Sequence, residues 1–215
     1  MKKIRASFPS GELSLEGILS VPQRAGPFPA VIVCHPHPLY GGSMDNNVVR
    51  SLCETLAQAS LASFRFNFRG AGGSQGEFDH GRGEREDVKA AISFTTAVEG
   101  VDSKRIGLAG YSAGAGFALP VGCDDERIKA LAAISPPFSM FNFDFLKDCL
   151  KPKLLITGGE DEFVPTDRFL EFCRSLPEPK ECACIEGVDH FWRGHESRLA
   201  TRVAAFFVAV LESQA

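Results

Sequence analysis

Short apolar segments alternate with stretches of helical apolar spacing along most of the chain. The segments 30–34, 61–68, 105–109, 128–134, 153–157 and 181–185 are interpreted as strands, and the uninterrupted run at 30–34 is typical of a strand covered on both faces. Segments 84–97, 166–175 and 196–211 are interpreted as helices, as is a stretch capped by Asn46 or Asn47. Two further strands, 3–8 and 12–20, open the chain. This alternation predicts an α/β fold: a mostly parallel, doubly wound sheet with helices on both faces.

The composition is that of one ordinary globular domain over residues 1–215, with 44% hydrophobic and 23% charged residues. No linker divides the chain, and the phenylalanine-rich stretch at about 136–150 is expected to form a short cap-like insertion, roughly one helix. No apolar run approaches the ~20 residues of a membrane span, and no signal peptide is recognised after Met1. The net charge of −4, without a basic cluster, gives no reason to expect a nucleic-acid partner.

Seven cysteines are scattered along the chain without a C-x-x-C pair. This usage predicts buried free thiols in a reducing compartment, the cytoplasm, rather than a disulfide framework. Cys182 and Cys184 alternate along a predicted strand and so share one face, but neither a metal site nor a redox pair is expected there.

The segment Gly110-Tyr-Ser-Ala-Gly114 lies between a predicted strand and a small-residue run that predicts a helix. A G-x-S-x-G turn in this setting is typical of a nucleophile elbow, in which a strained backbone presents the serine hydroxyl at the tip. The flanking positions are glycine because strand and helix backbones pass close by. Ser112 is therefore the candidate nucleophile.

A serine nucleophile needs a histidine base and a carboxylate that orients the histidine. In the chain order Ser, acid, His, Asp161 follows the predicted strand 153–157 and His190 follows the strand 181–185. Carboxyl ends of parallel strands meet at one sheet edge, so the three side chains are expected to converge there. Alternatives for the acid are Glu160 as the runner-up, Glu162 and Asp167; alternatives for the base are His35, His37, His80 and His195. Asp189 is interpreted as a loop or cap residue.

The chain resembles small serine hydrolases of the α/β-hydrolase superfamily, in its dienelactone-hydrolase-like or carboxylesterase-like part. The resemblance covers nearly the whole chain and implies a catalytic triad of Ser112, Asp161, from its spacing to Val164-Pro165, and His190. Dienelactone hydrolases carry cysteine at the elbow, so a dienelactone substrate is not implied. The matching motifs are His35–Gly42, Asn67–Gly76, Gly110–Gly114, Gly159–Pro165 and Asp189-His190-Phe191.

An oxyanion hole should take one N–H from Ala113 and a second from the loop 35–42. Pro36 and Pro38 have no N–H, which leaves His37, Leu39 and Tyr40. Leu39 or Tyr40 is favoured, whereas resemblance to loops with a shorter His-Gly-x form points to His37.

The phenylalanines of the 136–150 segment, Phe138 and Phe141 among them, either line an acyl pocket or cover the core. The glycine-rich stretch 67–76 does not match a dinucleotide fingerprint, and it is interpreted as a structural loop in which Arg69 anchors carboxylates or backbone. No cofactor is expected, and no metal at His35, His37 and His190, since a serine triad needs none.

These features predict a serine hydrolase that cleaves a small carboxylic ester or thioester through an acyl-enzyme intermediate. Two alternatives remain: a catalytically silent α/β-hydrolase-fold binding protein, and a peptidase or acyltransferase that uses the same triad. The expected partner is a small ester. A homodimer through the N-terminal edge strand or the last helix is compatible with the sequence.

Overall fold

The computed structural model describes residues 1–213 and centres on an eight-stranded sheet in the order β1-β2-β4-β3-β5-β6-β7-β8. The first two strands are antiparallel to their neighbours, and all pairings from β4 to β8 are parallel. The predicted mostly parallel sheet is confirmed. The strands are β1 (Lys2–Ser10), β2 (Leu13–Val21), β3 (Phe28–Cys34), β4 (Ala62–Phe66), β5 (Val101–Tyr111), β6 (Ile128–Ile134), β7 (Lys153–Gly158) and β8 (Lys180–Ile185).

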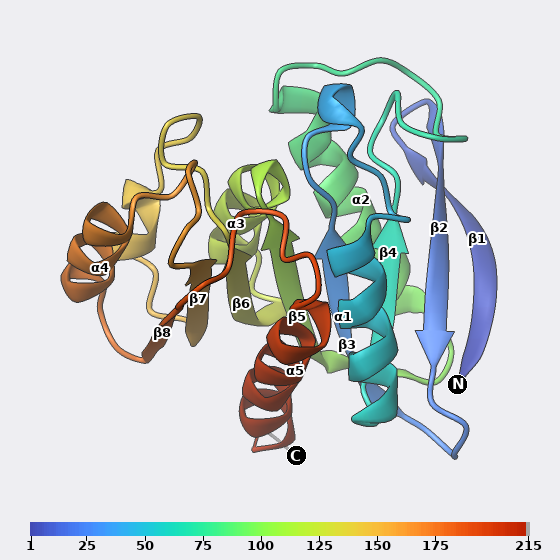
Figure 1. Ribbon diagram of the computed structural model, residues 1–215. Helices are drawn as coiled ribbons and strands as arrows, with labels where there is room; N and C mark the ends of the chain where they lie inside the picture. The colour runs from blue at the N-terminus through green and yellow to red at the C-terminus, as the bar shows by residue number, and fades with distance from the viewer. Residues whose placement is uncertain (214–215) are drawn as a thin grey trace.

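Helices cover both faces of the sheet (Figure 1). On one face α1 and α5 lie side by side and bury Leu52 and Phe207 against Val31 and Ile156. The opposite face carries α2, α3 and α4. The helices are α1 (Asn47–Gln58), α2 (Arg82–Ala97), α3 (Ala113–Asp124), α4 (Thr166–Ser175) and α5 (Glu196–Glu212), with single turns η1 (Pro38–Tyr40) and η2 (Asp144–Lys147).

The start of α1 shows how the sequence sets an element boundary. The Asn46 side-chain oxygen accepts hydrogen bonds from the amides of Val48 at 2.9 Å and Val49 at 3.4 Å. These are amides of the first turn, which have no partner within the helix. Of the two predicted caps, Asn46 is therefore the one used.

The segment 136–150 contains only the one-turn helix η2, less than the single helix expected for a cap-like insertion. Its aromatic side chains pack inward: Phe138 contacts Phe143 and the α4 residue Phe172, with ring centroids 5.6 and 5.1 Å apart. Because the phenylalanines are used in this packing, the segment forms part of the core of the α3–α4 side.

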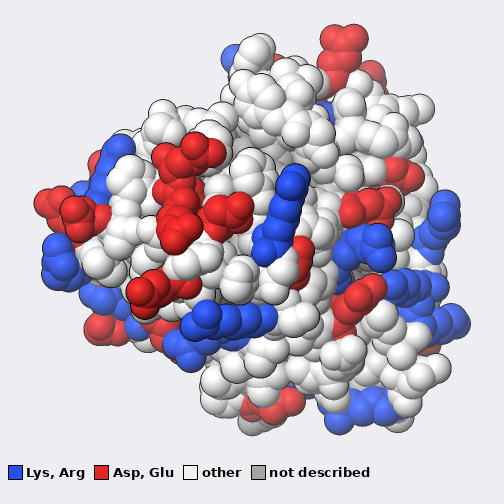
Figure 2. Space-filling model, viewed as in Figure 1, with Lys and Arg blue, Asp and Glu red and all other residues white. Residues whose placement is uncertain are grey.

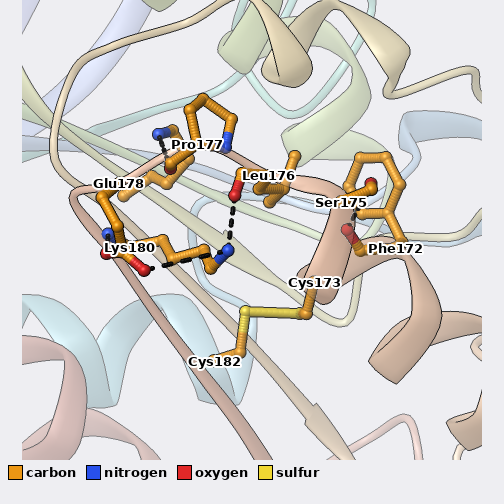
Figure 3. Close-up of a disulfide and its surroundings, with 9 residues drawn as sticks. Phe172, Cys173, Ser175, Leu176, Pro177, Glu178, Lys180 and Cys182 are labelled. Atoms are coloured by element: carbon orange, nitrogen blue, oxygen red, sulfur yellow. Dashed lines mark hydrogen bonds and ion pairs between the residues drawn. A yellow bond between two sulfur atoms is a disulfide. The ribbon is translucent and has the colours of Figure 1, made fainter.

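A disulfide joins Cys173 on α4 to Cys182 on β8 (Figure 3). The expectation that all the cysteines are free thiols is therefore wrong for this pair. The two cysteines are nine residues apart, and they meet because α4 packs against the adjacent strand β8. No sequence spacing encodes that packing. Cys182 and Cys184 do share one face of β8, as predicted, and both pack against the same apolar core cluster.

Basic and acidic side chains are interspersed over the face of the molecule shown in Figure 2, without one continuous basic patch on that face. Within residues 1–213, none of the helices has both the length and the apolar character needed to span a bilayer. The strands β1 and β8 form the two edges of the sheet.

Candidate active site

The turn between β5 and α3 holds Ser112 in a positive-φ conformation, φ 54° and ψ −124°. A side chain is excluded from both flanking glycines. A Cβ on Gly110 would lie 2.4 Å from the Ala115 Cα, and one on Gly114 would lie 2.4 Å from the His35 carbonyl oxygen. Side-chain-bearing residues pay a steric cost for such φ values, so the strained serine is held in place by the packed strand and helix around it.

Ser112, His190 and Asp161 form one hydrogen-bonded chain at the carboxyl ends of β5, β7 and β8. The Nε2 atom of His190 lies 3.0 Å from the Ser112 Oγ, and its Nδ1 lies 2.9 Å from both carboxylate oxygens of Asp161. All three side chains are largely buried. The three side chains, each from a different strand-end loop, thus lie together at one edge of the sheet, as expected.

The Asp161 carboxylate is surrounded by donors. It accepts hydrogen bonds from the amides of Phe163 and Val164 and from the Thr157 hydroxyl, at 3.0 to 3.1 Å, besides the one from His190. Burial raises the pKa of Asp161, but the hydrogen bond and charge of His190, with the Phe163 amide, outweigh burial and hold this pKa below its ordinary value. Asp161 is therefore ionised at neutral pH.

The rival acids do not take part in this chain of bonds. Glu160, Glu162 and Asp167 are all exposed, and the Glu160 amide is turned to the carbonyl of Val188.

The rival histidines have other places in the fold. His35 is fully buried and accepts a hydrogen bond at Nε2 from the amide of Phe68, while its Nδ1 donates to the carbonyl of Pro36. Burial lowers the pKa of His35 to about 4, so it is a neutral side chain that ties two loops together. His80 is exposed, and His195 is the residue before α5. Within residues 1–213 no group of three or more metal-ligating side chains is found.

The loop 35–42 presents a different amide from the two favoured from the sequence. The Leu39 amide donates to the ring Nδ1 of His37 at 3.2 Å, and the Tyr40 amide donates to the His37 carbonyl at 3.1 Å. Both amides are used in closing the turn η1, so they are replaced by His37 as the candidate donor. Among residues 1–213, the structure gives the His37 N–H no acceptor.

The Ala113 N–H is the first amide of α3 and has no partner one turn back in the helix. Close approach of Gly114 to the carbonyls of Cys34 and His35 places this helix end beside the loop that carries His37. Among the described residues, Ala113 and His37 are therefore candidate amide donors next to Ser112.

A cavity of about 390 Å³ opens at Ser112 and His190. Phe138 and Phe141 do not line it, because Phe138 packs against α4 and Phe141 packs on Phe117, with ring centroids 5.3 Å apart. The assignment of Phe138 and Phe141 to the pocket is thus corrected: the 136–150 segment contributes Pro137 and Met140 instead. The remaining lining residues are Pro36, His37, Tyr40, Gly41, Gly42, Asn46, Tyr111, Phe163 and Phe191.

Phe163 and Phe191 were not singled out from the sequence. Each lies within two residues of a member of the Ser112–His190–Asp161 hydrogen-bonded chain, Phe163 after Asp161 and Phe191 after His190. That adjacency was the available signal, since residues in the same strand-end loop as Asp161 or His190 lie at the same sheet edge.

Two sets of side-chain interactions stabilise loops of the protein that the sequence motifs contain. The Asp189 carboxylate accepts hydrogen bonds from the amides of Phe191 and Trp192, both at 3.0 Å, which is the loop role expected for it. Arg69 forms an ion pair with the buried Asp87 at 2.8 Å, so the glycine-rich loop is anchored to α2 as predicted.

Comparisons with known proteins agree with this fold. A family model described as X-Pro dipeptidyl-peptidase (S15 family) matches residues 13–163. An uncharacterised protein of Rickettsia prowazekii is 31% identical over 190 residues, 85% of this chain and 79% of the relative.

Two solved structures are similar over almost their whole length. An α/β serine hydrolase homologue from Coxiella burnetii is 33% identical with a TM-score of 0.85, over 94% of this chain and 98% of that one. A serine hydrolase without a lid from Xanthomonas campestris is 28% identical with a TM-score of 0.83, over 97% and 94%. The chain belongs to the X-Pro dipeptidyl-peptidase (S15) family, within the α/β-hydrolase superfamily that its motifs resemble.

Proposed function

We propose that this protein is a serine hydrolase that cleaves a carboxylic ester or thioester of a small molecule through an acyl-enzyme. The observation that carries the proposal is the hydrogen-bonded chain from Ser112 through His190 to Asp161. An ionised carboxylate only accepts hydrogen bonds, so the Nδ1–H of His190 donates to Asp161. That tautomer leaves Nε2 with a lone pair toward the serine hydroxyl, as a general base requires.

Acylation would begin with attack of the Ser112 Oγ on the carbonyl carbon while its proton passes to the Nε2 of His190. Asp161 stabilises the imidazolium that forms. The Ala113 and His37 amides would hold the oxyanion of the tetrahedral intermediate. His190 then returns the proton to the leaving oxygen or sulfur as its bond to the carbonyl carbon breaks. Water, activated by the same imidazole, releases the acid in the second half-reaction.

A peptidase is the second candidate, because the family model that matches the chain describes a dipeptidyl peptidase. Such an enzyme must hold the free α-ammonium group of its substrate, which calls for a carboxylate in the site. The cavity at Ser112 has no aspartate or glutamate among its described lining residues. This absence favours an uncharged ester over a peptide with a free amino terminus. An acyltransferase would use the same acyl-enzyme with an acceptor other than water.

A fluorophosphonate probe tests the proposal, because it reacts only with an activated serine. We expect the wild-type protein to be labelled and to hydrolyse short-chain esters, and Ser112→Ala to lose both properties while remaining folded. Ser139→Ala is the matched control, since Ser139 is exposed and outside the cavity. Undiminished labelling of Ser112→Ala would refute the assignment, and a wild type that is neither labelled nor active would support the silent binding protein. Turnover of an X-Pro dipeptide p-nitroanilide in place of esters would establish the peptidase.

A further inference from the structure

The cavity at Ser112 differs in chemistry from two larger cavities that lie beside it. The described residues that line it include no aspartate, glutamate, lysine or arginine. The neighbouring cavities, of about 600 and 910 Å³, contain several each, among them Lys147, Arg168 and Glu171 in one and Arg82 and Arg85 in the other. A charged group of a substrate would lose its hydration in the Ser112 cavity without gaining a counter-charge from a side chain that lines it. The Arg193 guanidinium lies outside this lining, 5.8 Å from the ring centroid of Phe191.

Two phenylalanine rings lie against the imidazole of His190. The ring centroid of Phe163 is 4.7 Å from that of His190, and the ring centroid of Phe191 is 5.5 Å from it. Phe163 comes from the loop after β7 and Phe191 from the loop after β8. Both rings remain partly in water, with exposed fractions of 39% and 47%. Large apolar side chains left exposed at a cavity mouth mark a surface that a ligand covers.

The role of His190 identifies which part of the substrate these rings meet. In the proposed mechanism His190 gives its Nε2 proton to the oxygen of the departing alcohol, so that oxygen must come within hydrogen-bond distance of the imidazole. The carbonyl oxygen is drawn instead to the amides of Ala113 and His37. The alcohol portion is therefore the part that lies beside the imidazole and its two neighbouring rings.

We propose that Phe163 and Phe191 form the binding site for the alcohol portion of the ester, and that this site selects an uncharged aromatic alcohol. The inference rests on the proposed function and adds the chemical class of the leaving group. Aromatic rings gain from edge-to-face and offset contacts with other rings, beyond the apolar area that they remove from water.

Truncation of either ring can be made without removing a hydrogen bond of the triad loops. The main-chain amide of Phe163 donates to Asp161, and that of Phe191 donates to Asp189. Alanine keeps both amides. Phe163→Ala and Phe191→Ala therefore remove the rings and leave the backbone turns their hydrogen bonds.

The test compares three butyrate esters: benzyl butyrate, methyl butyrate and 4-carboxybenzyl butyrate. All give the same butyryl-enzyme, so differences in kcat/KM report acylation and hence the alcohol. We expect kcat/KM for benzyl butyrate to exceed that for methyl butyrate and that for 4-carboxybenzyl butyrate, each by about tenfold or more. Each phenylalanine variant should lower the benzyl-to-methyl ratio by roughly tenfold. Leu150→Ala, which removes an exposed side chain outside the cavity, should leave the ratio unchanged.

Several results would overturn the inference. A ratio unchanged in both phenylalanine variants would show that the rings do not bind the alcohol. Equal losses on the benzyl and methyl esters would show that the rings only position His190. Efficient use of the carboxybenzyl ester would show that the site accepts charge. In each case Ser112 is still labelled and methyl butyrate is still cleaved by the wild type. Failure of the proposed function differs, since labelling and turnover of every ester are then absent and both proposals fall.

Discussion

The Tyr111 hydroxyl donates a hydrogen bond to the main-chain carbonyl of His190, with 2.9 Å between the two oxygens. Tyr111 immediately precedes the candidate nucleophile, and its ring centroid lies 5.8 Å from that of the imidazole. One buried hydrogen bond therefore connects the turn that carries Ser112 to the loop that carries His190. The same loop places the His190 Nε2 3.0 Å from the Ser112 Oγ, so we infer that this bond helps to hold the imidazole at that distance.

Tyr111→Phe should lower kcat/KM for esters by about tenfold, because the His190 loop loses its tie to the elbow while the ring still fills its place. The free energy of unfolding should fall by only about 1 kcal/mol, the usual net worth of one hydrogen bond. Ester kinetics and denaturant unfolding measure the two effects. Ser7→Ala is the control, since it removes an exposed side-chain hydrogen bond, to Ser14, outside the cavity. A loss of stability without a loss of rate would assign the Tyr111 hydroxyl a structural role only.

His37→Pro should lower kcat by about 10²- to 10³-fold, as expected for the loss of one oxyanion donor. Proline removes the N–H, and the φ of −53° at His37 already suits a proline ring. His37→Ala keeps the N–H and removes the imidazole, so its rate should fall far less. Steady-state kinetics on one short ester compare the kcat of the two variants, and thermal unfolding checks that both are folded. Equal activity in the two variants would exclude the His37 amide from the oxyanion hole.

The buried His35 should make the protein less stable as the pH falls from 6.5 to 4. Its pKa is about 4 in the folded protein and 6.5 ordinarily, so in this window the unfolded chain binds a proton that the folded protein does not. The contribution of neutral His35 to the unfolding free energy is fully present above pH 6.5. It decreases as the pH falls and is lost near pH 4, the pKa of His35 in the folded protein. The loss should total about 3 kcal/mol.

Denaturant unfolding of the wild type and of His35→Gln between pH 7 and 4 measures this contribution of His35 to the unfolding free energy. Glutamine can still accept from the Phe68 amide but does not titrate. The unfolding free energy of the wild type, relative to that of the variant, should therefore fall by about 3 kcal/mol toward acid pH. A difference that is constant with pH would mean that His35 is protonated in the folded protein.

Loss of the Cys173–Cys182 disulfide should lower the free energy of unfolding by about 2–3 kcal/mol, because a short closed loop is released in the unfolded chain. Cys182→Ser, or the wild type in reductant, should show the loss. Cys184→Ser is the matched control, since Cys184 lies on the same strand and its thiol is free. Reductant should change neither the stability of Cys182→Ser nor its mass, and an equal loss in both serine variants would argue against the bond.

Much of the fold was readable from local patterns. The bounds of β6 and α4 agree with the segments 128–134 and 166–175, because each is a continuous run of suitable residues between clear breaks. The placement of Ser112, Asp161 and His190 at one sheet edge also follows from the sequence, since each comes at or just after the end of a parallel strand. These inferences need only short-range spacing and the rule that parallel strands end together.

The other features depend on contacts between distant segments. The Leu39 and Tyr40 amides are both available in the sequence, but the folded turn η1 uses them and leaves His37. Phe138 and Phe141 have the composition of a pocket wall, yet they pack on residues of α4 and α3 and line a different cavity, whereas Met140 lies at the cavity of Ser112. Cys173 and Cys182 become neighbours through the packing of α4 on β8.

The sequence by itself determined which residues can do chemistry and in what order the sheet delivers them, because strand and turn preferences are local. Only the tertiary structure decided which amide of the loop 35–42 is left without an acceptor in the described part of the chain, which rings line the cavity and which thiols meet. In each case several residues have suitable chemistry. Which of them is used depends on how side chains pack and which hydrogen bonds form between segments far apart in the chain.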